Sequence, residues 1–229
     1  MEAFGPCARV TGVCMSSYTL APDLAKKLLQ DQVAPDDVIA AIRGAGREPF
    51  DGGPFDMNLV AVRHPGRGEN RFNDKMHLLY RGADKAWEVF TLAVTTDPGA
   101  TYLKSPSRPN GTAIIKAGFH AKLWKLGLHK GEKRALVQAA PVTVWRDNDR
   151  DAELDIGAPT STETGSFGIN FHRGPSRHDP AHPSPVNNWS AGCVVAQEEQ
   201  EFLDALALCD LQRLTHPSWQ TFSLLLLEA

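Results

Sequence analysis

From Met57 onward the chain consists of short β-like runs separated by turn-rich segments. The runs are NLVAVR, KMHLLY, WEVFTLAVTT, TAIIKAGF and ALVQAAPVTVW, and the breaks include HPGRGEN, RGADK, TDPG, SPSRPNG and RDNDRD. Runs at this spacing favour a mostly antiparallel sheet, closed as a sandwich or barrel, over βαβ units. Within this half, residues 197–211 predict one long helix, and TFSLLLLEA predicts a closing strand.

The N-terminal part has a different pattern. Residues 19–47 carry two short apolar faces at helical spacing, which follow Pro22 and Pro35. EPFDGGPF after them has the composition of a linker. We therefore predict a mainly β fold, a sandwich or barrel with a few helices, preceded by a short N-terminal helical segment. The predicted domains are an appendage, 1–50, and a catalytic domain, 51–229.

Composition and charge exclude several classes of protein. With 229 residues, 42% hydrophobic and 22% charged, the chain has the composition of an ordinary globular protein. A formal net charge of −3 gives no broad attraction to nucleic acid, so no nucleic-acid partner is expected. No apolar run reaches the roughly 18 residues of a membrane span. The N-terminus lacks the basic and apolar regions of a secretory signal, so synthesis in the cytoplasm is expected.

The four cysteines have different settings. Cys7 and Cys14 are close enough in sequence to pair in an oxidising compartment, or they stay free. Cys209 shares a helical apolar stripe with Phe202 and Leu206, which predicts an inert core thiol. Cys193 stands apart, because it follows Ser190-Ala191-Gly192 in NWSAGCVV, where small residues permit a sharp turn.

A cysteine nucleophile attacks as the thiolate, so it needs a base nearby. His172 in FGINFHRGP is the candidate base, since a strand ending there would present its ring beside a loop. Backbone N–H groups around Gly192 and Cys193 would stabilise an oxyanion. Ser190 is predicted to form the turn or to donate on the oxyanion side.

His172, a gap of 17 residues and then Ser190-x-Gly192-Cys193 resemble the signature of the L,D-transpeptidase (YkuD-type) catalytic domain family. The segment LAVTTDPG…PNGTAIIKAGFH is similar to the family's strand–turn–strand before the histidine. The wording TTDPG, GLHKG…ALVQ, VWRD and FGINFHRG…NWSAGCVV looks closest to a branch found in phage lysis proteins and related peptidoglycan-targeting proteins.

The resemblance implies a cysteine enzyme that acts on peptidoglycan stem peptides. Cys193, activated by His172, would attack the bond to the terminal D-residue of a tetrapeptide stem and form a thioester. Water or an amine would then resolve it, giving L,D-carboxypeptidase or L,D-transpeptidase activity. Action in the periplasm or cell wall, as an endolysin or antibacterial effector, would require holin-type or secretion-system delivery, with lysis or secretion machinery or an immunity protein as partners. No cofactor is expected.

The chain departs from the family pattern at two positions. The residue before the Gly is Ala191, and Val195 stands where the family has an arginine two places after the cysteine. Anchoring of a substrate carboxylate would then fall to Arg173, which would support the site, or to Arg177. Trp189 and His129 are predicted to line the substrate cleft, with a surface turn as the alternative for His129.

Two segments carry residue types that bind metals, and a solvated loop is the alternative for each. His178 and His182 are four residues apart, but flanking prolines forbid the helix that would align them for zinc, so no metal is predicted. RDNDRDAELD has alternating oxygen ligands but lacks the glycine and the final acid of an EF-hand loop, which favours a charged hairpin turn.

Two rival functions use the same residues. The first is a cysteine amidase or peptidase acting on another substrate with the same dyad. The second is a non-catalytic cell-wall-binding module with a degenerate site, which the departures at Ala191 and Val195 favour. Only the family interpretation predicts release of D-alanine from a tetrapeptide stem, and only the binding module predicts that Cys193→Ala leaves biological activity intact.

Overall fold

The computed structural model describes residues 18–229 apart from 67–69, 152, 158–159 and 175–184. Before them it describes the backbone of two short strands, β1 (Arg9–Val10) and β2 (Val13–Cys14), which pair antiparallel. The predictions made for Cys7, for the side chain of Cys14, and for Arg177, His178 and His182 lie outside the described residues.

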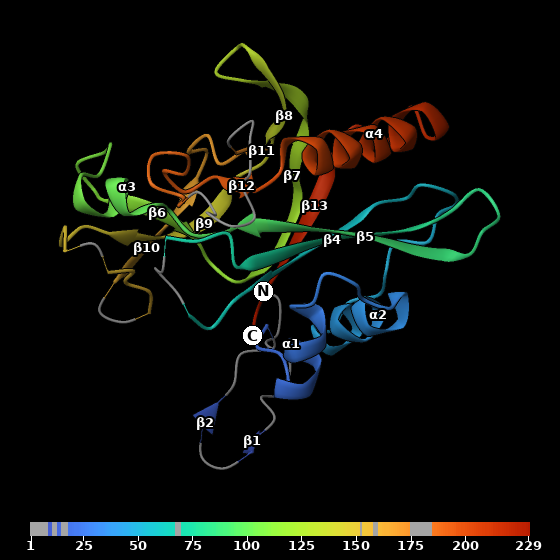
Figure 1. The fold of residues 1–229 in the computed structure, drawn as a ribbon, viewed down its shortest axis with the longest axis horizontal. Coiled ribbons are helices and arrows are strands. Elements are labelled where there is room, and N and C mark those ends of the chain that lie inside the picture. The colour runs from blue at the N-terminus through green and yellow to red at the C-terminus, as the bar shows by residue number, and fades with distance from the viewer. Residues whose placement is uncertain are drawn as a thin grey trace, which may run out of the picture.

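Eight strands close into a mixed barrel in the order β11-β12-β5-β4-β3-β13-β7-β8 (Figure 1). This confirms the prediction of a mainly β fold. Two neighbouring pairs, β11 with β12 and β13 with β3, are parallel, and the remaining pairs are antiparallel. The barrel strands are β3 (Asn58–Arg63), β4 (Asp74–Arg81), β5 (Trp87–Thr95), β7 (Gly118–His129), β8 (Lys133–Gln138), β11 (Phe171–Arg173), β12 (Val194–Ala196) and β13 (Phe222–Glu228).

A small sheet of three strands, β10-β9-β6, lies beside the barrel. It comprises β6 (Thr112–Ile115), β9 (Val142–Asp147) and β10 (Ser161–Gly165). The sequence runs TAIIKAGF and ALVQAAPVTVW each divide between this sheet and the barrel. Pro141 lies at one break, where it has no N–H to continue the β8 ladder, and Gly118, with φ +153°, lies at the other. The charged segment after Asp147 joins β9 to β10, and these two strands pair antiparallel.

Helix α4 (Glu199–Thr215) packs on the main core, and α3 (Ala100–Lys104) is a single short turn between β5 and β6. Phe202, Leu206 and Cys209 of α4 are each at most 1% exposed, which confirms the predicted stripe. Burial raises the pKa of Cys209 far above its usual range, so this thiol is inert. No helix within the described residues is both long and apolar enough to cross a membrane.

Helices α1 (Pro22–Leu28) and α2 (Pro35–Gly44) pack on the face of the sheet opposite to α4 (Figure 1). They form a second hydrophobic cluster with outward-facing residues of β3, β4 and β13. Alternate residues of these strands therefore face two different cores, which explains why they read as continuous apolar runs. The division into domains at residue 50 stays a prediction, although the helices share this core with the barrel.

His77 of β4 connects the two layers. It is fully buried, and its Nε2 lies 2.9 Å from the carbonyl oxygen of Leu28 at the end of α1. Its Nδ1 lies 2.9 Å from Thr91 Oγ1. The carbonyl can only accept, so Nε2 carries the proton and the Thr91 hydroxyl donates to Nδ1. Burial lowers the pKa of His77 to about 4.

We expect His77 to make the fold sensitive to acid. A histidine with a lowered folded-state pKa contributes stability above its unfolded pKa of roughly 6.5, and this contribution is lost as pH falls through 4. Between pH 7 and 4.5, His77 should account for about 2 kcal/mol of the fall in the free energy of unfolding. Urea unfolding should show a smaller fall for His77→Ala than for wild type; an equal fall would contradict this role.

Candidate active site

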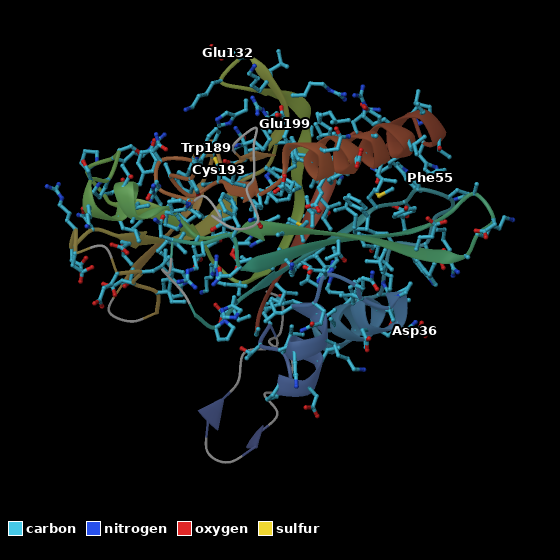
Figure 2. The ribbon with its side chains drawn as sticks, in the orientation of Figure 1. Asp36, Phe55, Glu132, Trp189, Cys193 and Glu199 are labelled. Atoms are coloured by element: carbon cyan, nitrogen blue, oxygen red, sulfur yellow. The ribbon has the colours of Figure 1, made fainter. Side chains whose placement is uncertain are left out.

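The parallel pairing of β11 and β12 brings Cys193 and His172 together. His172 pairs in register with Val195, two residues after Cys193. Cys193 Sγ and one ring nitrogen each of His172 and His129 all lie within 4.8 Å of one another. The segments that carry the candidate nucleophile and base therefore meet although 20 residues separate them in the chain. In Figure 2, Trp189 and Cys193 lie on the segment that leads into β12, and Glu132 lies at the tip of the β7–β8 hairpin.

A tight turn presents Cys193. The buried Ser190 hydroxyl donates to the Cys193 carbonyl oxygen at 2.7 Å and accepts the Gly192 N–H at 3.2 Å. Of the two roles predicted for Ser190, its hydrogen bonds match that of turn-former. Gly192 has φ +120°, and a Cβ there would lie 2.4 Å from the Ala113 carbonyl oxygen of β6. Only glycine fits this corner, because a side chain would be strained and would collide with backbone.

His172 is held in the tautomer that a general base needs. Its Nδ1 lies 2.8 Å from the Arg173 carbonyl oxygen, an acceptor, so Nδ1 carries the proton and Nε2 keeps its lone pair. The ring is only 6% exposed. Burial lowers the pKa of His172 to about 4, so the imidazole is neutral at physiological pH. This carbonyl was missing from the sequence prediction, because a main-chain acceptor leaves no signal in residue type.

The Cys193 thiol is partly exposed and has two backbone contacts. The Asn170 N–H donates to Sγ at 3.4 Å, and the Gly168 carbonyl oxygen lies 3.4 Å from Sγ as an acceptor for the S–H. Burial raises the pKa of Cys193, against the opposing effects of the Asn170 N–H and the positive charge of Lys130. In the resting site the thiol and the imidazole are therefore both neutral, rather than a thiolate–imidazolium pair.

His129, at the end of β7, stacks on His172 with ring centroids 4.1 Å apart. Asn170 Oδ1 accepts the Gln138 N–H at 2.9 Å, so the amide nitrogen of Asn170 faces His129 Nδ1 at 2.9 Å. The amide nitrogen of Asn170 donates, so Nδ1 of His129 accepts. The ring proton of His129 is therefore on Nε2. Of the two stacked histidines, His172 is thus the one with a free Nε2 lone pair.

The same three residues form the one candidate metal site among the described residues. Two imidazoles and a thiolate suit Zn²⁺, which would need each ligand nitrogen deprotonated. The amide orientation of Asn170 places a proton on Nε2 of His129, which opposes metal binding through that atom. The donor types therefore fit zinc, but the hydrogen bonds fit a metal-free dyad better.

Two cavities flank the dyad. The larger, about 370 Å³, lies on the His172 side and is lined by His129, Lys130, Glu132, Lys133, His172, Arg173, Asn188 and Trp189. The smaller, about 90 Å³, lies on the Cys193 side between the small sheet and the cysteine turn, and Ala191 lines it. Trp189, at 39% exposed, belongs to the wall of the larger cavity, beside His129 and Arg173.

The positions considered for binding a substrate carboxylate differ in their burial and contacts. Val195, which stands where the resembling family has an arginine, is fully buried in β12. Arg173 lines the larger cavity, but its guanidinium pairs with Glu199 at 3.0 Å, so part of its charge is already neutralised. Arg177 lies outside the described residues. Sequence reasoning missed Arg146, a buried arginine of β9 that lines the smaller cavity with Cys193.

We expect alkylation of Cys193 to report the neutral resting pair. Because burial raises the pKa of this thiol, labelling by iodoacetamide should accelerate steadily from pH 7 to 10. Buried Cys209 should stay unlabelled while the fold is intact, and peptide mapping by mass spectrometry separates the sites. A labelling rate that is flat between pH 5 and 8 would indicate a pre-formed thiolate and contradict this expectation.

Substitution of Gly192 should disturb the turn. We expect Gly192→Ala to lower the free energy of unfolding by about 2–4 kcal/mol, through the strained φ and the contact with Ala113. Gly44→Ala in α2 is the control, because a Cβ there meets nothing within 4 Å; it should be neutral or stabilise by up to about 1 kcal/mol. Equal unfolding curves for the two variants would refute the argument.

Comparisons of the chain with family models, with curated proteins and with solved structures find no match. The geometry of the dyad and the resemblance carried by the residues around it are therefore the grounds for assigning a function.

Proposed function

We propose that the protein is a cysteine enzyme of the L,D-transpeptidase or L,D-carboxypeptidase type that acts on the peptide stems of peptidoglycan. The observation that carries this proposal is the approach of Cys193 Sγ to the His172 ring within 4.8 Å, beside open cavities. The dyad supports acyl transfer through a thiol. The choice of substrate follows from the resemblance of the residues around the dyad.

The first step is transfer of the thiol proton. In the resting site the S–H faces the Gly168 carbonyl oxygen, so it must rotate toward His172 before transfer to Nε2. The Asn170 N–H stays on the sulfur and stabilises the thiolate that forms. Because both groups are neutral at rest, the proton moves as the sulfur attacks the substrate carbonyl carbon, as in general-base catalysis.

The attack places negative charge on the carbonyl oxygen, which needs donors. The Cys193 N–H has no hydrogen-bond partner among the described residues, so it is available as a donor. The Gly192 N–H, expected to share this role, already donates to Ser190 Oγ. We therefore assign the oxyanion site to the Cys193 N–H, with Gly192 acting through the shape of the turn.

The intermediate then collapses to a thioester. The C–N bond to the terminal D-residue breaks, and His172 returns its proton to the leaving amine. Water or the amine of a second stem, deprotonated by His172, attacks the thioester and releases the thiol. Hydrolysis gives an L,D-carboxypeptidase, and aminolysis gives an L,D-transpeptidase. The two cavities on either side of the dyad provide room for both segments of the peptide.

Mass spectrometry of muropeptides tests this function. Incubation of the full chain with tetrapeptide stems should release D-alanine and give tripeptides, or give dimers and exchanged terminal residues if transfer dominates. Cys193→Ala and His172→Ala should each lower the rate by about 10³-fold or more. Cys209→Ala, a thiol outside the site, should retain the wild-type rate.

The rival functions give other results. Turnover of a different amide with the same dependence on Cys193 would favour another cysteine amidase or peptidase. Wall binding that survives Cys193→Ala, without turnover, would favour the binding module. Stoichiometric zinc in the purified protein, with activity abolished by chelation, would assign the three-residue cluster to a metal instead. Each of these results would overturn the proposal.

A further inference from the structure

The smaller cavity beside Cys193 has a distinctly positive lining. Its charged side chains are the exposed Arg108 and the buried Arg146, and no acidic residue is among the described residues that line it. Cys193 lines the same cavity. A cavity that holds a candidate nucleophile and two guanidinium groups favours an anionic group of the substrate.

Arg146 is held in place by contacts that leave one of its nitrogens unused. Its side chain is 4% exposed, and its Nε lies 2.7 Å from Glu163 Oε2. Nη1 donates to the Gly111 carbonyl oxygen at 3.3 Å, and the guanidinium lies 4.4 Å from the centre of the Phe167 ring. Nη2 is buried and has no hydrogen-bond partner among the described residues.

An unpartnered donor on a buried arginine is costly, so it calls for an explanation. Glu163 does not supply one, because it contacts the Nε edge, is 43% exposed and also accepts a hydrogen bond from Asn110 Nδ2 at 2.7 Å. A carboxylate oxygen bound in the cavity would give Nη2 the acceptor that it lacks. Arg108 at the same cavity would add a second positive charge.

We propose that this cavity is a carboxylate subsite, in which Arg146 binds the α-carboxylate of the residue that leaves. This inference rests on the proposed function. In a peptide cut next to its C-terminus, the free carboxylate lies three bonds from the carbonyl carbon that the sulfur attacks. Cys193 and Arg146 line one cavity, so the carbonyl and the carboxylate can occupy it together. Arg146 thereby takes the role that the buried Val195 cannot fill.

Two alkylating agents of similar size test the subsite without a peptide. Iodoacetate carries a carboxylate and iodoacetamide does not; with either, a C–S bond forms at Cys193, iodide leaves with the electron pair and the thiol proton goes to buffer. The iodoacetate-to-iodoacetamide rate ratio should fall about tenfold in Arg146→Gln, the loss expected for a charge-assisted hydrogen bond. Arg134→Gln is the matched control, since Arg134 pairs with Asp210 and lines neither cavity.

A second variant guards against misfolding of Arg146→Gln. Glu163→Gln keeps the guanidinium and removes its internal anion, so the same ratio should rise above wild type. Circular dichroism establishes that each variant is folded. An equal ratio in wild type and folded Arg146→Gln would overturn the subsite. If Arg146→Gln does not fold, a ratio in Glu163→Gln at or below wild type would overturn it.

Peptide substrates separate this inference from the proposed function. Wild type should prefer a tetrapeptide stem with a free C-terminal carboxylate over its C-terminal amide, and Arg146→Gln should lose that preference mainly through KM. Selective alkylation without turnover of any stem would leave the carboxylate subsite standing and remove the proposed function. Turnover with the same preference in wild type and Arg146→Gln would keep the function and remove the subsite.

Discussion

The candidate site depends on the hydrogen bonds of Asn170. Its N–H contacts Cys193 Sγ, its carbonyl accepts the Val194 N–H, and its amide connects Gln138 to His129. Asn170 therefore sets both the position of the Cys193 sulfur and the tautomer of His129. Gln138 extends this framework, because its Oε1 accepts three successive backbone N–H groups from 167–169. Three backbone N–H groups of the loop before β11 are thereby satisfied by one side chain of β8.

Burial determines the protonation states of Cys193 and His172. It favours the neutral forms of both partners, raising the pKa of Cys193 and lowering that of His172 to about 4. Such a site holds no standing thiolate, which is prone to oxidation; under the proposed function, the nucleophile forms only when the proton moves to His172. In the neighbouring cavity, Arg146 is also buried, and its Nη2 has no hydrogen-bond partner among the described residues.

Much of the fold could be read from local patterns. The runs that became β3, β4 and β5 and the stripe of α4 were predictable because alternation and helical spacing are properties of neighbouring residues. The pairing of Cys193 with His172 was predictable only through the spacing of a resembling motif. The short strands β11 and β12 carry little pattern of their own, since three residues are too few to show a period.

The sequence by itself determined a mainly β chain with N-terminal helices, a glycine corner before Cys193 and a histidine at suitable spacing. Only the tertiary structure decided which strands close the barrel and where each run splits into the small sheet. It also brought His129 onto His172 and Arg146 into the cavity of Cys193, although each lies more than 25 positions from its partner in the chain. The physical reason is that hydrogen-bond partners, burial and charge depend on contacts between distant strands, whereas periodicity and turn chemistry depend on adjacent residues.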